Sequence, residues 1–263
     1  MNLCFSTLGC TEYSLSGILS LCGGFGISFL EIRGMDGELD LQRIPEFSER
    51  QIPETVLRFR SAGVVPLILG TSCSFHHPEK RQTVQAEGTA ALAVAKSLGA
   101  MGIRVFGDRF ADDPVQTTET VIAGIADLCA GAEGSDVRVL LEVHGDFHTV
   151  EALAPILRAF ETEPHFGLIW DIAHTHPAYG NDWKRFYDAT APWIRHVHIK
   201  DAAGGRLVLP GEGEIPILPI VSQLLSDGYT GAFSLEWERK WHPELPPIEI
   251  ALERFVSLME RVR

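Results

Sequence analysis

Long apolar runs and an excess of basic residues are both missing from this sequence of 263 residues. No apolar run approaches the roughly 18 residues that a membrane-spanning helix needs, so we expect no membrane span. Lysine and arginine number 22 against 35 aspartates and glutamates, which gives a formal net charge of -13. An acidic balance of this size opposes sequence-independent binding to a phosphate backbone. We therefore expect neither a membrane nor a nucleic acid as a partner.

Cysteine is scarce, and its spacing forms no recognisable pair. The five cysteines include no CxxC motif, and their number is odd. This pattern predicts buried or incidental free thiols in a reducing compartment. The first residues, MNLCFSTLGC, also lack the basic segment and the apolar stretch of about 7–15 residues that a secretory signal carries. We interpret them as a first strand and expect a cytoplasmic protein.

Neither a linker nor a Gly-rich phosphate loop interrupts the chain. Short β-rich runs alternate with longer helical patterns about every 30–40 residues, which predicts a parallel sheet. The stretch STLGCTEYS after the first strand contains no GxGxxG motif, and this disfavours an open doubly wound sheet. Eight strand–helix units in this length predict a closed (β/α)₈ TIM barrel, with one domain spanning residues 1–263.

The boundaries of the expected elements follow from composition and turn residues. Helices are expected over 80–98, 114–130, 217–225 and 248–262, with another starting at Thr149 as N-cap. Gly99 is a natural residue to end the first of these helices. The eight expected strands begin at Leu3, Ser28, Val64, Gly102, Val137, Phe166, Ile194 and Ala232.

Strands in the second half of the chain break the rule that a parallel barrel strand is apolar on both faces. In the seventh strand, Val197 and Ile199 alternate with His196, His198 and Lys200. Because side chains alternate along a strand, the apolar set packs under the helices and the polar set enters the barrel. The fifth, sixth and eighth strands likewise carry acidic residues near their C-terminal ends, namely Glu142, Asp171 and Glu236.

These polar residues predict a metal site at the barrel mouth. Burying several unpaired charges would cost several kcal/mol each, and a bound cation removes that cost. The candidate ligands are three carboxylates and one imidazole from consecutive strand ends: Glu142, Asp171, His198 and Glu236. The excess of oxygen favours Mn²⁺ or Mg²⁺, and Co²⁺ or Zn²⁺ stays open. For each residue alone, a buried salt bridge or a hydrogen-bonded core histidine is the alternative.

Five motifs in this order, LEVHGDF, WDIAH, HVHIKD, PGEGEIP and SLEWE, resemble the xylose isomerase-like TIM barrels of the sugar phosphate isomerase/epimerase superfamily. Ketose 3-epimerases, hydroxypyruvate isomerases, inosose dehydratases, dehydroshikimate dehydratases and endonuclease IV enzymes belong to that group. The resemblance spans essentially the whole chain and is strongest over 137–238. It implies the same four metal ligands. It also implies that His174 contacts substrate or a second metal, and that the loop carrying Glu212 closes over the site. Glu212 is a candidate for contact with the substrate, and a solvated loop charge is the alternative.

The resemblance implies an isomerase or epimerase acting on a small ketose or keto-polyol. In that reaction the metal chelates two substrate oxygens and stabilises the enediolate formed when a proton leaves the carbon next to the carbonyl. Glu142 and Glu236 are the candidates for removing and returning this proton. His174 and Lys200 are candidates for hydrogen bonds to substrate oxygens. A structural ion pair of Lys200 with Asp201 or Glu236 is the alternative.

Residues in the first half of the barrel are candidates for substrate specificity. Arg33, Arg104 and His76 lie on or just after the second, fourth and third strands, where they could bind hydroxyls or a carboxylate. An Arg33–Glu31 structural pair is the alternative for the first of them. His144 is a further candidate. No cluster of Arg and Lys is placed for a phosphate, which favours an unphosphorylated sugar, polyol ketone or small hydroxy-keto acid.

Three other functions remain open from the sequence. A dehydratase of an inosose or dehydroshikimate-like substrate would use the same metal and first step, with His144, His148 or His174 as general acid. A barrel that had lost catalysis and served as a binding protein would be expected to lose metal-ligating residues first, and this sequence keeps all four. An endonuclease IV-like enzyme would need further histidines. The stretch before the Gly-Glu-Gly loop offers none, and the adjacent His76 and His77 do not replace them.

Overall fold

The strands of the computed structural model, which describes residues 1–262, close into one barrel. All the barrel pairings are parallel, in the order β1-β10-β7-β6-β5-β4-β3-β2. The barrel strands are β1 (Asn2–Ser6), β2 (Phe29–Ile32), β3 (Val65–Ser74), β4 (Gly102–Phe106), β5 (Arg138–Glu142), β6 (Phe166–Asp171), β7 (Ile194–Ile199) and β10 (Ala232–Leu235). The predicted TIM barrel and its eight strands are therefore confirmed.

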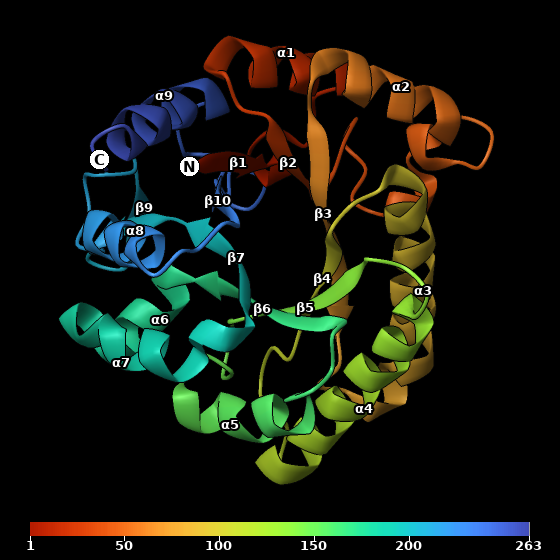
Figure 1. The fold of residues 1–263 in the computed structure, drawn as a ribbon, viewed down its shortest axis with the longest axis vertical. Coiled ribbons are helices and arrows are strands. Elements are labelled where there is room, and N and C mark those ends of the chain that lie inside the picture. Colours follow the sequence, from red (N-terminus) through yellow and green to blue (C-terminus); the bar gives the residue numbers. More distant parts are fainter. Residues whose placement is uncertain (263) are drawn as a thin grey trace.

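The helices lie in a ring outside the strands (Figure 1). They are α1 (Leu15–Phe25), α2 (Ile52–Ala62), α3 (Arg81–Leu98), α4 (Pro114–Ala132), α5 (Val150–Ala159), α6 (Ile172–Tyr179), α7 (Trp183–Thr190), α8 (Ile217–Ser226) and α9 (Ile248–Met259). Thr149 caps α5 by accepting from Ala152 N, and Gly99 ends α3 in the left-handed conformation, as expected. No helix among the described residues is both long and apolar enough to cross a membrane.

A short antiparallel hairpin follows β7 and was not expected from the sequence. Its strands are β8 (Asp201–Ala203) and β9 (Arg206–Val208), joined by Gly204 and Gly205 with φ of 54° and 76°. Three residues are too few to show hydrophobic alternation, and only the Gly-Gly turn marked this position. The hairpin extends the chain above the C-terminal end of β7, beside the candidate site.

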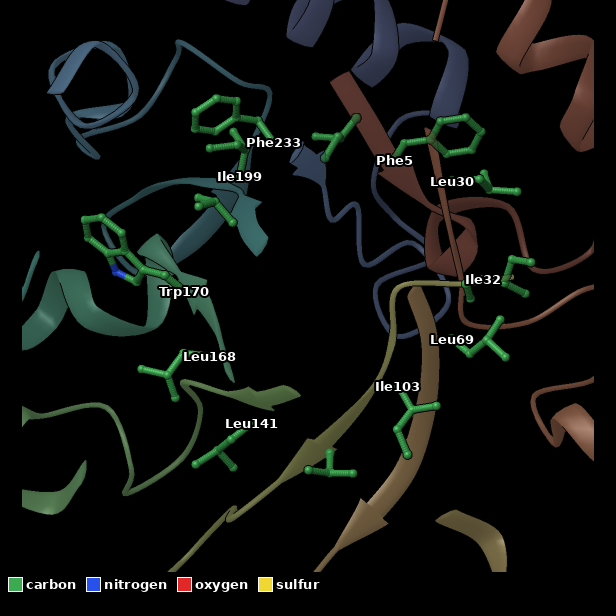
Figure 2. Packing of buried hydrophobic residues seen from close by; sticks show 14 of the residues in the cluster. Phe5, Leu30, Ile32, Leu69, Ile103, Leu141, Leu168, Trp170, Ile199 and Phe233 are labelled. Atoms are coloured by element: carbon green, nitrogen blue, oxygen red, sulfur yellow. The ribbon is translucent and has the colours of Figure 1, made fainter. Parts of the chain in front are cut away.

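The apolar side chains of the barrel strands form the packed layer between sheet and helices. Residues from all eight strands, including Leu141, Ile199 and Phe233, stand around the barrel in this layer (Figure 2). Ile68, Leu140 and Ile169 form a separate small cluster. Since Leu140 and Ile169 share strand faces with Glu142 and Asp171, this cluster forms an apolar floor inside the barrel, beneath the polar residues.

Candidate metal centre

Four neighbouring strand ends bring three carboxylates and one imidazole together inside the barrel mouth. Each side chain offers one ligand atom, these atoms all lie within 4.8 Å of one another, and the side chains are 0–3% exposed. Two are the last residues of their strands, one is the penultimate residue of β7, and one directly follows β10. They are Glu142, Asp171, His198 and Glu236.

A register shift between β6 and β7 turns the histidines into the barrel. Leu168 pairs with Ile194, but Ile169 pairs with His196, so one residue of β7 is skipped. Beyond this irregularity His198 lies opposite Asp171. Neighbouring residues at equal register in parallel strands point to the same face, and therefore Asp171 and His198 both point inward.

Three buried carboxylates of this cluster lie close to one another and to one imidazole. Like charges confined in one buried place are unfavourable, and a group of such oxygens converging on one point is typical of a site that takes a cation. The donor set fits a divalent ion, because it provides carboxylate oxygens and one imidazole nitrogen. The converging atoms are Glu142 Oε2, Asp171 Oδ2, His198 Nδ1 and Glu236 Oε2, which accept or donate no well-formed hydrogen bond, although the three oxygens lie within ion-pairing distance of Arg104 or Lys200.

Two basic side chains balance part of the negative charge. Arg104 Nη1 lies 3.1 Å from both Glu142 Oε2 and Glu236 Oε1. Lys200 Nζ lies 2.8 Å from Asp171 Oδ2 and 2.6 Å from Glu236 Oε2. Although burial opposes it, the carboxylates around Lys200 raise its pKa well above the usual value. Lys200 is therefore a buried, permanently charged group directly above the cluster.

The two glutamates of the cluster differ in their affinity for a proton. Burial, together with the charge of Glu236, raises the pKa of Glu142 to about 8. Burial acts on Glu236 in the same direction, but His198 and Lys200 outweigh it and hold the pKa of that carboxyl well below its usual range. A pair of carboxylates separated in this way provides one proton carrier and one group that stays ionised.

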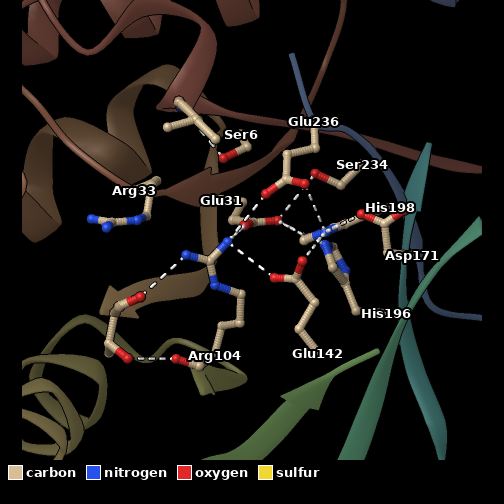
Figure 3. A network of polar contacts seen from close by, with 12 residues as sticks. Ser6, Glu31, Arg33, Arg104, Glu142, Asp171, His196, His198, Ser234 and Glu236 are labelled. Carbon is tan, nitrogen blue, oxygen red and sulfur yellow. Dashed lines mark hydrogen bonds and ion pairs between the residues drawn. The ribbon is translucent and has the colours of Figure 1, made fainter. Parts of the chain in front are cut away.

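Glu31 on β2 is a component of the site that the sequence did not assign. Its Oε2 lies 2.9 Å from His198 Nε2 and 3.2 Å from His196 Nε2, and it accepts from Ser234 Oγ at 3.3 Å (Figure 3). With Nε2 directed at Glu31, His198 presents Nδ1 to the carboxylate cluster. The charged glutamate in a strand of apolar neighbours was the signal that marked this position.

We expect Glu31→Gln to weaken divalent-metal binding about 10- to 100-fold, because a carboxylate behind a metal-ligating histidine fixes its tautomer and raises its basicity. Titration of Mn²⁺ into metal-free wild-type and variant protein measures the change. Glu38, which is half-buried and pairs with Arg43 outside the cluster, provides the control variant Glu38→Gln. Equal Mn²⁺ affinities for all three proteins would remove Glu31 from the site.

The structure places the other predicted residues at different distances from this cluster. Arg104 lines the adjoining cavity but is engaged by the acidic cluster. His76 Nδ1 lies 2.7 Å from Ser74 Oγ in a hydrogen bond. Ser74 lines the cavity, and His76 does not. Glu212 is not brought to the site, because its side chain is 46% exposed and pairs with Arg254 at 3.1 Å on the surface.

The loop of Glu212 is held by Asp201 rather than by a contact with the cavity. Asp201 Oδ2 accepts from Gly211 N at 2.8 Å and from Gly213 N at 2.9 Å. Asp201 is thereby unavailable to Lys200. Of the two partners considered for a structural ion pair of Lys200, Asp201 forms none and Glu236 does. The expected Arg33–Glu31 pair does not form, because Glu31 faces the histidines.

His144 and His174 lie against each other at the edge of the cluster, with ring centroids 4.2 Å apart and ring planes tilted by 60°. His174 Nε2 is 3.8 Å from Asp171 Oδ2, and burial lowers the pKa of His174 to about 4. Burial, with the charge of Lys200, also lowers the pKa of His144. Both rings are therefore neutral near pH 7. His144 lines the cavity of about 280 Å³ above Glu142 and Glu236, and His174 lines a neighbouring cavity of about 810 Å³.

Comparisons with known proteins agree with this architecture. A family model described as the xylose isomerase-like TIM barrel matches residues 21–258. A search of curated proteins finds no significant match.

Several solved structures share the fold over nearly their whole length. The probable 3-DHS dehydratase AsbF from Bacillus anthracis has a TM-score of 0.80 at 16% identity, covering 99% of both chains. The IolI protein with a binding zinc atom has a TM-score of 0.81 at 22% identity, covering 100% of this chain and 98% of its own. The 3-keto-D-glucoside 4-epimerase YcjR from E. coli has a TM-score of 0.77 at 15% identity, covering 99% of both chains. The TM-scores show that these proteins and this chain share one fold.

Proposed function

Because this chain belongs to the xylose isomerase-like TIM barrel family, we propose that it is a divalent-metal-dependent sugar isomerase or epimerase. The observation that carries the proposal is the convergence of four buried ligand atoms beneath a cavity at the C-terminal end of the barrel. The proposed ligands are Glu142, Asp171, His198 and Glu236. Three oxygen donors favour Mn²⁺ or Mg²⁺ among the divalent ions.

A bound divalent ion would supply Lewis-acid stabilisation of the negative charge that develops on the substrate oxygens. Glu142 is the group we assign to proton transfer, since its buried carboxylate also lines the cavity above the ligand cluster. Glu236 stays ionised between Arg104 and Lys200. Lys200 lines the same cavity and is placed to donate a hydrogen bond to a substrate oxygen.

The substrate proposed for this reaction is a small ketose or a related keto-polyol. The cavity, of about 280 Å³, has room for one small molecule and is walled by polar groups such as Ser72, Ser74 and Asp108. Trp241, 54% exposed, stands at its rim, where an indole face can pack against a sugar ring.

The dehydratase alternative needs a general acid next to the leaving hydroxyl. His144 and His174 are neutral near pH 7 because burial lowers their pKa values, which makes each a poor proton donor. His148 directs Nδ1 to Gly145 O at 2.6 Å and does not line either cavity. These features disfavour the three histidines as the general acid that a dehydratase needs.

A cytoplasmic location also belongs to this proposal. All five cysteines are buried free thiols, which is compatible with a reducing compartment.

We expect the purified protein to bind about one equivalent of divalent metal and to exchange deuterium from D₂O into the carbon next to the carbonyl of its substrate. Elemental analysis and NMR of a panel of ketoses and inososes measure both properties. Glu236→Ala should lose the metal and the exchange, while the surface variant Glu212→Ala keeps them. A new enone absorbance with loss of water would indicate the dehydratase instead. If the wild type held less than half an equivalent of metal, and Glu236→Ala held the same amount, the protein would not be a metalloenzyme.

A further inference from the structure

Arg33 is a buried cation that forms no ion pair with an acidic side chain among residues 1–262. It directly follows β2, is 6% exposed and lines the same cavity as Glu142 and Glu236. Its contacts are neutral: Nη2 donates to Ser72 Oγ at 2.8 Å and Nη1 to Leu39 O at 3.3 Å. In Figure 3 it lies outside the dashed network that joins the glutamates.

Arg104 shows the contrast, because its charge is balanced by two glutamates of the cluster. Gly70 of β3 leaves room for both arginines: a Cβ at this position would lie 2.8 Å from Arg33 Cδ and 3.4 Å from Arg104 Nη2. A side chain at position 70 would therefore displace Arg33 from its place. The fold brings two guanidinium groups to one wall of the cavity and neutralises only one of them.

The carboxylate of Glu87 forms no ion pair with Arg33. Glu87 Oε1 accepts instead from the backbone N–H of Ser72 at 2.6 Å. Burial and the charge of Arg104 lower the pKa of Arg33 to about 10, against the opposite effect of the charges of Glu87, Glu236 and Glu142, so the group remains a cation at neutral pH. A buried cation without a counter-ion is unfavourable, and an anion bound in the cavity removes this cost.

We propose that Arg33 and the hydroxyl of Ser72 bind a carboxylate of the substrate, so that the ketose or keto-polyol of the proposed function carries an acid group. This inference rests on the proposed function, because it concerns the substrate of the same cavity. A planar carboxylate matches the fork of guanidinium donors. A phosphate is disfavoured, because Arg104 and Lys200 are already paired and leave Arg33 as the one uncompensated cation that the described residues present to the cavity.

Removing the charge of Arg33 tests whether this residue serves substrate binding or the stability of the fold. Arg33→Met keeps much of the side-chain length and discards a buried unpaired charge, so its melting temperature should equal or exceed that of the wild type. Arg58 donates to Ser16 Oγ at 2.8 Å on the surface, and Arg58→Met is the matched control. A lower melting temperature for Arg33→Met alone would assign Arg33 a structural role and overturn the proposal.

Calorimetric titration with matched probes tests the carboxylate itself. The probes are 5-keto-D-gluconate against L-sorbose and 2-keto-D-gluconate against D-fructose, because each acid carries a carboxylate in place of one hydroxymethyl group. We expect wild type and Arg58→Met to bind at least one acid about tenfold or more tightly than its neutral partner. Arg33→Met should lose this preference and bind the neutral ketose unchanged.

The titrations are run both with Mn²⁺ and after treatment with EDTA. Binding through Arg33 does not need the metal, so a failed metal hypothesis leaves the acid preference measurable. The carboxylate proposal is overturned if the wild type prefers the acid by less than about tenfold in both pairs, or if it binds neither acid detectably. It is also overturned if Arg33→Met keeps the preference for the acid. Tighter binding of D-fructose 6-phosphate than of both acids overturns it in favour of a phosphate.

Discussion

Replacing His198 with alanine is expected to remove the divalent ion and to lower kcat/KM by about a thousandfold or more. The expected loss is large because a bound metal contributes several kcal/mol of charge stabilisation in the transition state. His198 Nδ1 is the one nitrogen in the cluster of proposed ligand atoms, 3.3 Å from Glu236 Oε2. Elemental analysis of the purified variant and steady-state kinetics on the same preparation measure the two effects.

His196 provides the matched control for this variant, because it lies on the same strand two residues away. It is also fully buried and also contacts Glu31, at 3.2 Å, but it takes no part in the four-residue cluster. His196→Ala should keep the metal and lose about 1–3 kcal/mol of unfolding free energy, because Glu31 loses a buried partner. If both variants lost the metal to the same degree, the ligand assignment on β7 would be wrong.

Replacing Lys200 with methionine is expected to lower kcat by about 10²- to 10⁴-fold, the range typical of a positioned group that assists proton transfer. Lys200 lines the cavity, is 3% exposed and contacts Asp171 and Glu236 at 2.8 and 2.6 Å. The metal content should stay near that of the wild type, because Lys200 supplies no ligand atom. Kinetics at saturating substrate together with elemental analysis separate the loss of turnover from a loss of metal.

Breaking the ion pairs of Lys200 also affects stability, since removing one partner of a buried pair costs about 3–5 kcal/mol. Lys184 pairs with Asp188 at 2.7 Å on an exposed face of α7, and Lys184→Met should change neither turnover nor stability measurably. Where Lys200→Met does not fold, Lys200→Arg keeps the charge and should still lower kcat. Turnover within about threefold of the wild type in either folded variant would contradict the assignment of Lys200 to catalysis.

Local sequence patterns were sufficient to predict the architecture, because periodicity and residues at element ends identify each strand and helix. Alternation of strand and helix patterns predicted the parallel barrel, and single residues such as Thr149 and Gly99 marked helix ends. Parity within β7 separated Val197 and Ile199 from the two histidines. Three-residue strands carry no such periodicity, and the β8–β9 hairpin was therefore missed.

The partner of each charged side chain could not be predicted in the same way. Glu31 and Arg33 share a face of one strand, so pairing them was reasonable, yet Glu31 turns to His196 and His198 across the barrel. Glu212, in a loop whose motif resembled an active-site loop, pairs with Arg254 at the surface. These outcomes depend on contacts between residues far apart in the chain, which no local pattern records.

The sequence by itself determined the barrel, its strands and the four polar residues at the strand ends, because alternation of side chains along a strand is a local property. The tertiary structure alone decided how charges are matched: the carboxylate behind His198, the two glutamates around Arg104, and the absence of an acidic partner for Arg33 among the described residues. Barrel closure places distant side chains within ion-pairing distance, and strand register sets which of them meet.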